Sequence, residues 1–469
     1  MTMFRKLHAR PLARLATLAA ALALAGCTSM MPRYDRPAPP VGTDWPNVAA
    51  TQTGTPAREL PWQSFFPDPG LRALIDIALT NNRDLRVAVL NIEQARAQYD
   101  IRRADRLPTV GAAVNASRSP RPDGSGNVST YQVGLALTAW EIDFFGRIAS
   151  LSEVALAQYL ATEEGRKAAQ ISLVAAVANT WLSLVADEEL LAITEQTLAT
   201  RVESLRLSRL RFDAGVTSEL DLRLAQSLAD TARATLAQIQ RQRLQDRNAL
   251  ALLLGQPLPS GFSVTGSTDA LSLPEVPAGT PSEVLVRRPD VRQADQQLLA
   301  ANANIGAARA AFFPRISLTA GVGSASTQLS GLLESGSLGL TLAPQLLQPI
   351  FDAGRNRAGL RAASVNRDVA IAQYERAIQA AFREVADALA ARATLAEQLQ
   401  AQRDVREAEA ARLRLAQLRY DNGISSYLDL LDAQRSLFTA RQSLVQTRLA
   451  QLQNQVLLYR ALGGGWTGD

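Results

Sequence analysis

Three residues near the start of a predicted helix at 425–461, Leu428, Asp432 and Arg435, place charge and apolar bulk on one face. Asp432 lies four residues after Leu428 and three before Arg435, and residues at these spacings are neighbours on a helix surface. Asp429 lies in the first turn, where a carboxylate interacts favourably with the helix dipole. Asp432 lies further into the helix, so the dipole explains it less well. An ion pair with Arg435 is the chemistry that its position allows.

The chain of 469 residues contains one His and one Cys, His8 and Cys27, and this excludes several classes of site. A disulfide framework, a zinc site built on Cys and His, and a Cys–His catalytic pair all need more of these residues. Gly463–Gly465 are no phosphate loop, because no strand precedes them and no helix follows. The acids are spread along predicted helices, so an enzyme such as a periplasmic hydrolase is the weakest alternative. We predict no catalytic residue, no metal and no cofactor-binding residue.

The formal net charge of +5 lies mainly in the first 26 residues. Four basic residues and no acid occur there, so the rest of the chain has 49 − 4 = 45 basic residues against 44 acidic ones. A chain so close to neutral gives no case for a nucleic-acid partner.

The N-terminus has the order of a secretory signal peptide at 1–26. Its apolar stretch, Leu15–Leu24, follows a cationic segment and is too short to span a membrane. The LAGC sequence that ends at Cys27 resembles a bacterial lipobox, which implies cleavage before Cys27 and a covalent lipid on it. Thr28 follows, and a residue other than Asp there implies sorting to the outer membrane. A plain signal peptide with an incidental Cys is the alternative. The Pro-rich segment 27–60 then predicts an acylated, extended leader.

The rest of the chain consists of two similar sequence repeats, with matching residues about 206–208 positions apart. The sequence LRFDAGV from Leu210 matches LRYDNGI from Leu418, and Gly146-Arg147 matches Gly354-Arg355. This order of matches indicates a duplication whose halves pack around a pseudo-twofold axis. The predicted parts are a first repeat at 61–255, an inter-repeat segment at 256–280, a second repeat at 281–462 and a tail at 463–469.

Each repeat is predicted to contain two helices, two short strands and two very long helices. The long helices are rich in good helix formers, and the last one carries an apolar coiled-coil seam. Gly215 and Gly423 are expected caps in the turns that begin at Phe212 and Tyr420. Thr217, Ser218, Ser425 and Ser426 are candidate N-caps, and Asp221 is an acid whose position the helix dipole explains. The predicted helices are 68–80, 82–106, 146–213 and 217–254, then 281–287, 289–311, 354–421 and 425–461.

Four segments alternate apolar residues with small or polar ones, at 109–117, 131–140, 315–324 and 337–344. This pattern is typical of membrane barrel strands, with lipid on one side and water on the other. Two soluble hairpins docked on the helices are the alternative. Four strands cannot close a barrel, so closure must be shared between chains. Three copies would give twelve strands with room for a bore, and twelve long helices for a tube.

The chain resembles the TolC-type outer membrane factors, specifically their OprM/NodT-like lipoprotein branch. The resemblance runs nearly end to end and includes NRDLR from Asn82, WEIDFFGR from Trp140, IFDAGR from Ile350 and DAQRSLF from Asp432. It implies a mostly α fold with a small β part: a homotrimer with a 12-stranded transmembrane β-barrel continuous with a 12-helix periplasmic α-barrel. The implied function is the exit duct of a tripartite efflux pump in a Gram-negative outer membrane, exporting drugs or other small molecules.

The resemblance also implies partners and a site. The partners would be outer membrane lipid, a periplasmic adaptor (membrane fusion) protein and an inner-membrane transporter of the RND type. Leu428, Asp432 and Arg435 match the periplasmic gate of the family, and Asp429 matches a second acidic ring position of the TolC branch. The turns with Phe212, Gly215, Tyr420 and Gly423 would form the tip. A lipid-anchored periplasmic coiled-coil scaffold and a type I secretion duct remain as alternative functions.

Overall fold

The computed structural model describes residues 29–46, 55–121, 124–264, 266–279 and 285–466. The predicted signal peptide and the lipid site at Cys27 lie outside these residues. The chain forms two compact units. One comprises residues 1–38, 91–163 and 293–375, and the other residues 39–90, 164–292 and 376–469, within the described parts of these ranges. Each unit therefore combines segments from both sequence repeats.

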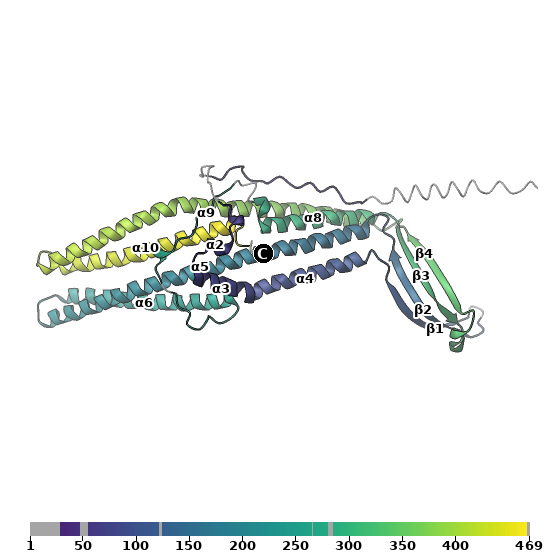
Figure 1. Cartoon of the computed structure of the whole chain (residues 1–469), viewed down its shortest axis with the longest axis horizontal. Helices are drawn as coiled ribbons and strands as arrows, with labels where there is room; N and C mark the ends of the chain where they lie inside the picture. The colour runs from purple at the N-terminus through teal and green to yellow at the C-terminus, as the bar shows by residue number, and fades with distance from the viewer. Residues whose placement is uncertain (1–28, 47–54, 122–123, 265, 280–284, 467–469) are drawn as a thin grey trace, which may run out of the picture. The chain divides into compact units, whose positions relative to one another are not determined.

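Helices make up most of the described chain, and the two repeats show the same order of elements (Figure 1). Local chemistry explains where they begin: α3 starts with Pro69, and the Asp68 carboxylate accepts the Leu71 amide at 2.8 Å. Of the predicted helix 281–287, residues 281–284 are outside the described part and 285–287 are helical. The main helices are α3 (Pro69–Asn81), α4 (Arg83–Ala104), α5 (Arg147–Asp213), α6 (Glu219–Leu254), α8 (Pro289–Ala310), α9 (Arg355–Asp421) and α10 (Tyr427–Ala461), with short turns α2 (Trp62–Phe65), η1 (Ala57–Glu59), η2 (Thr268–Ala270) and η3 (Leu329–Leu333).

The four strands form one antiparallel sheet in the order β1-β2-β3-β4. They are β1 (Val110–Pro120), β2 (Asn127–Glu141), β3 (Arg315–Ser326) and β4 (Leu338–Leu347). β2 begins four residues before the predicted position, because its hairpin with β1 continues to the Pro120–Asn127 pair. The outer strands, β1 and β4, each have one edge without a partner strand in the described chain.

Small residues form one row across the sheet. Ala113 pairs with Gly134, Gly134 with Gly323, and Gly323 with Gly339. A Cβ atom on Gly134 would lie 2.4 Å from the Val322 carbonyl oxygen, closer than real atoms approach. The strands therefore come together here in a way that only glycine permits.

The two faces of the sheet differ as the alternation predicts. A hollow of about 190 Å³ lies on the face of the sheet that carries the small and polar residues. Eleven of its fifteen lining residues are small or polar residues from the alternating positions of the strands. The apolar face is open, with Val114 and Leu340 each 78% exposed. The eleven are Ala113, Asn115, Gln132, Gly134, Ala136, Gly321, Gly323, Ala325, Ser337, Gly339 and Thr341.

A core of aromatic and aliphatic side chains lies in the second unit. Phe65 stacks on Tyr459 with ring centroids 4.0 Å apart, and the Tyr459 hydroxyl donates to the Leu60 carbonyl at 2.6 Å. Among the described helices, only α5 is long and apolar enough to cross a membrane. Of its most apolar stretch of 18 residues, 56% is buried inside the fold. A helix buried in a helical core can have the same length and apolar composition.

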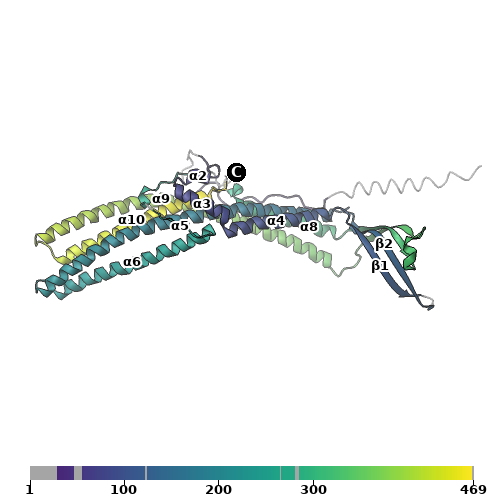
Figure 2. The same cartoon turned by 60° about the horizontal axis from the view of Figure 1, so that its bottom comes forward.

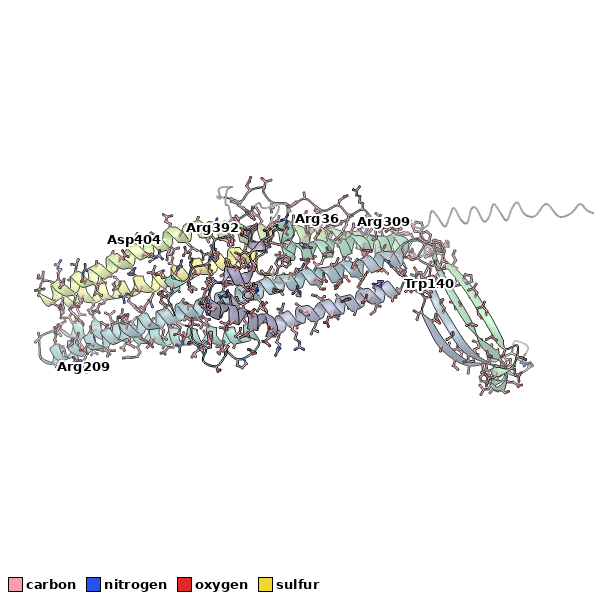
Figure 3. The ribbon with its side chains drawn as sticks, viewed as in Figure 1. Arg36, Trp140, Arg209, Arg309, Arg392 and Asp404 are labelled. Carbon is pink, nitrogen blue, oxygen red and sulfur yellow. The ribbon has the colours of Figure 1, made fainter. Side chains whose placement is uncertain are left out.

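The described part of the leader lies against α8 in the first unit. The Tyr34 hydroxyl and the Arg36 guanidinium both donate to the Asp295 carboxylate, the latter at 2.5 Å. Arg309 donates to the Met30 carbonyl at 3.3 Å, and Arg36 and Arg309 are both labelled in Figure 3. This contact holds residues 30–36 in place without helix or strand.

Candidate functional site

Two helical hairpins carry the predicted tip and gate residues. α5 and α6 lie side by side, as do α9 and α10, in both views (Figures 1 and 2). Arg209, labelled in Figure 3, lies near the end of α5.

The two hairpin turns have the same backbone geometry. Gly215 has φ of 71° and Gly423 has φ of 72°, a left-handed conformation that glycine adopts without steric cost. The Gly215 amide donates to the Phe212 carbonyl at 2.9 Å, and the Gly423 amide donates to the Tyr420 carbonyl at 3.0 Å. The next amide in each turn returns to the carbonyl five residues earlier, at 2.8 Å. Both turns are Schellman motifs, which satisfy the last carbonyls of the preceding helix.

The helices after the turns begin with matching caps. Ser218 and Ser426 are the N-caps, so α6 and α10 begin two residues later than predicted. Asp429 completes a capping box, because its carboxylate accepts the Ser426 amide at 3.2 Å. In the first hairpin, hydrogen bonds from Ser218 and then Thr217 lower the pKa of the Asp221 carboxyl.

The structure places Asp432 between two arginines. Arg435 donates to one carboxylate oxygen, and Arg412 of α9 donates to the other at 2.6 Å. Arg412 also reaches Glu409 at 3.2 Å. Hydrogen bonding and charge from Arg412 and Arg435 lower the pKa of the Asp432 carboxyl. The network therefore joins α9 to α10 about two and a half turns from the hairpin turn.

Sequence reasoning missed Arg412, although a signal for it exists. In an antiparallel hairpin, residues equally distant from the turn lie opposite each other. The turn centre is Asn422, and 422 − 412 = 432 − 422 = 10. Counting outward from the turn would have paired Arg412 with Asp432.

Leu428 and Tyr420 lie close to the tip but differ in their contacts. Leu428 is 54% exposed, so the chain's own fold leaves it largely uncovered. Tyr420 tilts against Tyr427 at 5.3 Å and accepts a hydrogen bond from Arg211 of α5. The Ser208 hydroxyl donates to the Tyr427 hydroxyl at 3.1 Å. The two hairpins are therefore linked near their tips by side chains of α5 and of the second turn.

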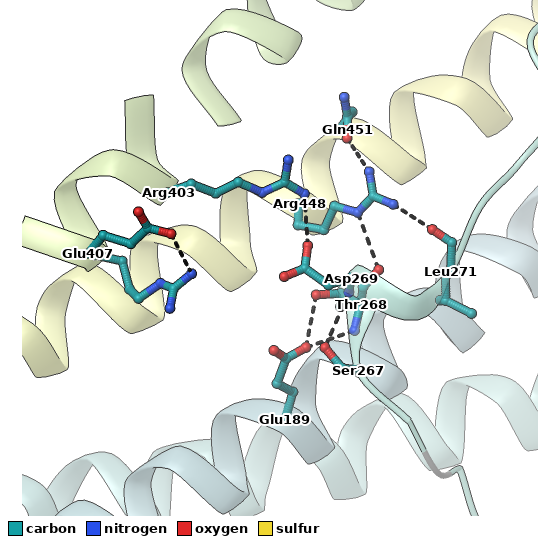
Figure 4. A network of polar contacts seen from close by, with 10 residues as sticks. Glu189, Ser267, Thr268, Asp269, Leu271, Arg403, Glu407, Arg448 and Gln451 are labelled. Atoms are coloured by element: carbon teal, nitrogen blue, oxygen red, sulfur yellow. Dashed lines mark hydrogen bonds and ion pairs between the residues drawn. The ribbon is translucent and has the colours of Figure 1, made fainter. Parts of the chain in front are cut away.

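A further polar network fixes the inter-repeat segment to the helices (Figure 4). Arg448 of α10 donates to the carbonyls of Thr268 and Leu271, the first at 3.2 Å. The Glu189 carboxylate accepts from both the amide and the hydroxyl of Thr268 at 2.8 Å. Asp269 forms an ion pair with Arg403 of α9 at 3.1 Å. This segment thus connects α5, α9 and α10.

One pair of acids is brought together where the sequence showed only acids spread along helices. Asp187 of α5 is 7% exposed and faces Asp246 of α6. Burial, followed by the charge and hydrogen bond of Asp246, raises the pKa of the Asp187 carboxyl to about 7. Glu188 acts in the same direction, and Arg243 opposes it. Among the described residues, no group of three or more His, Cys, Asp or Glu residues forms a metal site.

A model of the family described as "Outer membrane efflux protein" matches the chain in two segments, residues 74–256 and 280–464. These segments cover most of both repeats. The chain belongs to the outer membrane efflux protein family. This is a family of channels and not of enzymes.

Relatives in this family match along almost the whole chain. The solvent efflux pump outer membrane protein SrpC of Pseudomonas putida is 49% identical over 96% of this chain and 97% of its own length. The outer membrane protein OprJ of Pseudomonas aeruginosa is 46% identical, with 97% of each chain covered. The open-state crystal structure of the Neisseria gonorrhoeae MtrE outer membrane channel is 41% identical, with a TM-score of 0.87, and the match covers 94% of this chain and 99% of that one.

Proposed function

We propose that three copies of this chain form the outer membrane exit duct of a tripartite efflux pump. The observation that carries the proposal is the four-stranded sheet, which has an exposed apolar face, a small and polar opposite face, and two open edges. Relatives named as efflux pump outer membrane proteins support the same function. The duct would carry drugs or other small molecules out of the cell.

The open edges explain why closure needs several chains. In lipid, each unpaired backbone group costs several kcal/mol, so β1 and β4 need partners. Because the chain contributes an even number of antiparallel strands, β4 of one copy can pair antiparallel with β1 of the next. Three copies give twelve strands, and a barrel of this size has space for a bore lined by the small and polar face. The exposed apolar residues would then face lipid.

The network around Asp432 is proposed to hold the periplasmic end closed. Arg412 and Arg435 neutralise the carboxylate, so three copies of Asp432 could approach the axis without strong repulsion. Leu428, which its own chain leaves uncovered, would form an apolar constriction with its copies. A partner that separates α9 from α10 would break the pair between Arg412 and Asp432 and open the tip. Asp429 serves as a cap in each chain and could add a second acidic ring.

Anchoring and assembly complete the proposal. A lipid on Cys27 would attach each chain to the outer membrane of a Gram-negative cell, and the leader contact at Asp295 would hold the anchored segment to the body. No other cofactor is required. A periplasmic adaptor would dock at the tip turns, and an inner-membrane transporter of the RND type would deliver substrate.

The native mass of the detergent-extracted protein tests the shared barrel. We expect a trimer. A folded monomer in detergent would leave both sheet edges open and would contradict the barrel and the ring of gates together.

Single-channel conductance in a planar bilayer tests the gate. The double variant Asp432→Ala with Arg435→Ala should conduct more than the wild type, because the link between α9 and α10 is lost. The matched control is Asp230→Ala with Arg233→Ala, an exposed ion pair of the same spacing on α6. Equal conductance in all three proteins would exclude an ion lock at Asp432.

A further inference from the structure

A buried arginine lies in the first hairpin, and no acid among the described residues forms an ion pair with it. Arg201 of α5 is 3% exposed. One terminal nitrogen donates to the Leu228 carbonyl at 3.0 Å, and the guanidinium lies 4.9 Å from the ring of Phe438. Its Nε is buried and has no hydrogen-bond partner among the described residues. Arginine is almost never this buried unless it is paired, so the unused Nε of Arg201 needs an explanation.

The Arg201 guanidinium lines a cavity that a second arginine also lines. The cavity has a volume of about 120 Å³, and a water needs only about 10–15 Å³, so an ion of several atoms has room. Arg441 of α10, Thr197 and Thr200 of α5, and Gln434 also line it. No acid is present among its described lining residues. The hydroxyls of Thr197 and Thr200 already donate to the Ile193 and Gln196 carbonyls, so the donors left for an anion are the two permanent cations and the Gln434 amide.

Gln434 supplies a second unsatisfied polar group. Its Oε1 is buried and has no partner in the described part of the chain. The oxygen and nitrogen of a glutamine amide can exchange places by rotation, so the NH₂ group can point into the cavity instead. An anion would therefore satisfy Gln434 and the Arg201 Nε at once.

Comparison of the two repeats shows that the fold does not require a positive charge at the position of Arg201. At the spacing of 208 residues, the counterpart of Arg201 is Glu409, which pairs with Arg412 at 3.2 Å. Arg448 is a second comparison, because burial lowers its pKa as it does that of Arg201. Arg448 donates to two carbonyls and to Gln451, and its needs are met. Arg201 alone of these three positions combines burial, an unused donor and an adjoining cavity.

We propose that Arg201, Arg441 and Gln434 form a binding site for an oxyanion group. Planar guanidinium groups bind the oxygens of sulfate, phosphate and carboxylate through paired, charge-assisted hydrogen bonds. Leu413, Leu437 and Phe438 provide apolar walls that strengthen these bonds by limiting water. The occupant is either a free inorganic oxyanion or the side-chain carboxylate of a bound protein. The site does not depend on the pore or on the gate.

Thermal unfolding of the full-length protein in detergent tests this site. Sodium sulfate, or sodium N-acetylglutamate as the carboxylate probe, replaces sodium chloride at constant ionic strength. Sulfate also stabilises proteins without binding a site, so the saturable part of the response is the informative part. We expect saturable stabilisation of the wild type. Arg201→Gln should raise the apparent Kd about tenfold or more, because a charge-assisted hydrogen bond is lost.

Arg448→Gln is the control, since it removes a second arginine whose pKa burial lowers and which does not line this cavity. It should keep the saturable response of the wild type. If Arg201→Gln fails to fold, Arg441→Gln tests the same cavity from α10. Saturation by sulfate assigns a free oxyanion, and saturation by N-acetylglutamate alone assigns a protein carboxylate. Equal, unsaturable responses in the wild type and in the cavity variants would overturn the proposal.

Discussion

The hairpins α5–α6 and α9–α10 share the same turn and cap structure but differ in the surroundings of their acidic residues. Both have a Schellman turn and a serine cap followed by an aspartate. In α9–α10, Asp432 lies near the surface between two arginines. At the spacing of 208 residues its counterpart in α6 is Leu224. The first hairpin instead buries Asp187 against Asp246.

This difference teaches that the duplication kept the backbone devices and changed the charges. The pKa of Asp187 is raised in the folded state, so the folded protein binds its proton more tightly than the unfolded chain. Stability is then lost as pH rises from about 4 through about 7. The pKa of Asp432 is lowered, so its contribution is present above the unfolded value and is lost as pH falls through the folded value. The two hairpins should respond to pH with opposite signs.

The largest expected effect is at the buried pair. Asp187→Asn should raise the Tm by several degrees at pH 8, because the asparagine never has to ionise beside Asp246. The gain should shrink as the pH is lowered to 5, where the wild-type carboxyl is protonated. Thermal unfolding by circular dichroism across this range measures it, with the exposed Asp230→Asn as control. A gain that is the same at every pH would show that the pair is not titrating.

The turns should respond equally in the two hairpins. Gly215→Ala and Gly423→Ala should each cost about 1–2 kcal/mol, because a side chain disfavours positive φ although both sites have open space. Gly359→Ala is the control: this glycine lies inside α9 with open space and no positive φ, so alanine should stabilise by about 0.5–1 kcal/mol. Denaturant or thermal unfolding compares the three. Clearly unequal losses at the two turns would mean that contacts beyond the Schellman motif hold one of them.

Removing the N-cap serine should destabilise the two hairpins by slightly different amounts. Ser218→Ala and Ser426→Ala should each cost about 1 kcal/mol. Ser426→Ala should cost a little more, because its capping box is reciprocal. Ser227→Ala, in the exposed interior of α6, should change stability little. The same unfolding measurements decide, and a larger loss at Ser218 would reverse the predicted order.

The smallest expected effect is the acid response of Asp432, since its ion pairs are partly exposed and screened. Asp432→Asn should remove a small loss of stability below about pH 4, and high salt should weaken the difference from wild type. For Asp221→Asn the salt effect should be weaker, since hydroxyl and amide groups lower that pKa. Thermal unfolding against pH at low and high salt tests this. A response at Asp432 that salt leaves unchanged would argue against its arginine partners.

Much of the fold follows from local chemistry that the sequence displays. Gly215, Gly423, Ser218 and Ser426 each end or begin a helix because of their own conformational and hydrogen-bonding properties. The strand alternation likewise follows from the period of two in a pleated strand. α6 and α10 begin two residues after their predicted positions, because Thr217 and Ser425 precede the N-caps and each cap itself lies outside its helix.

Contacts between helices were harder to predict, for a physical reason. Partners such as Arg412 and Asp432 depend on the register of two long helices, which is set by the turn between them. Arg412 and Asp432 lie ten residues on either side of Asn422, so this pair could be predicted once the turn was known. The Asp187–Asp246 pair does not follow the same count, because its members lie 27 and 32 residues from Ala214, the equivalent position of the first turn. The hydrogen bond from Arg448 to the Thr268 carbonyl could not be predicted, since the inter-repeat segment has no periodic pattern that would fix its position.

The open edges of β1 and β4 have a genetic consequence. If every closed barrel needs intact edges from three chains, a variant with a further proline in β4, in addition to the native Pro344, would damage each assembly that it enters. In a cell that makes equal amounts of variant and normal chains, only about one trimer in eight would be wholly normal under random mixing. Such a mutation would be dominant, whereas loss of the gene copy would not.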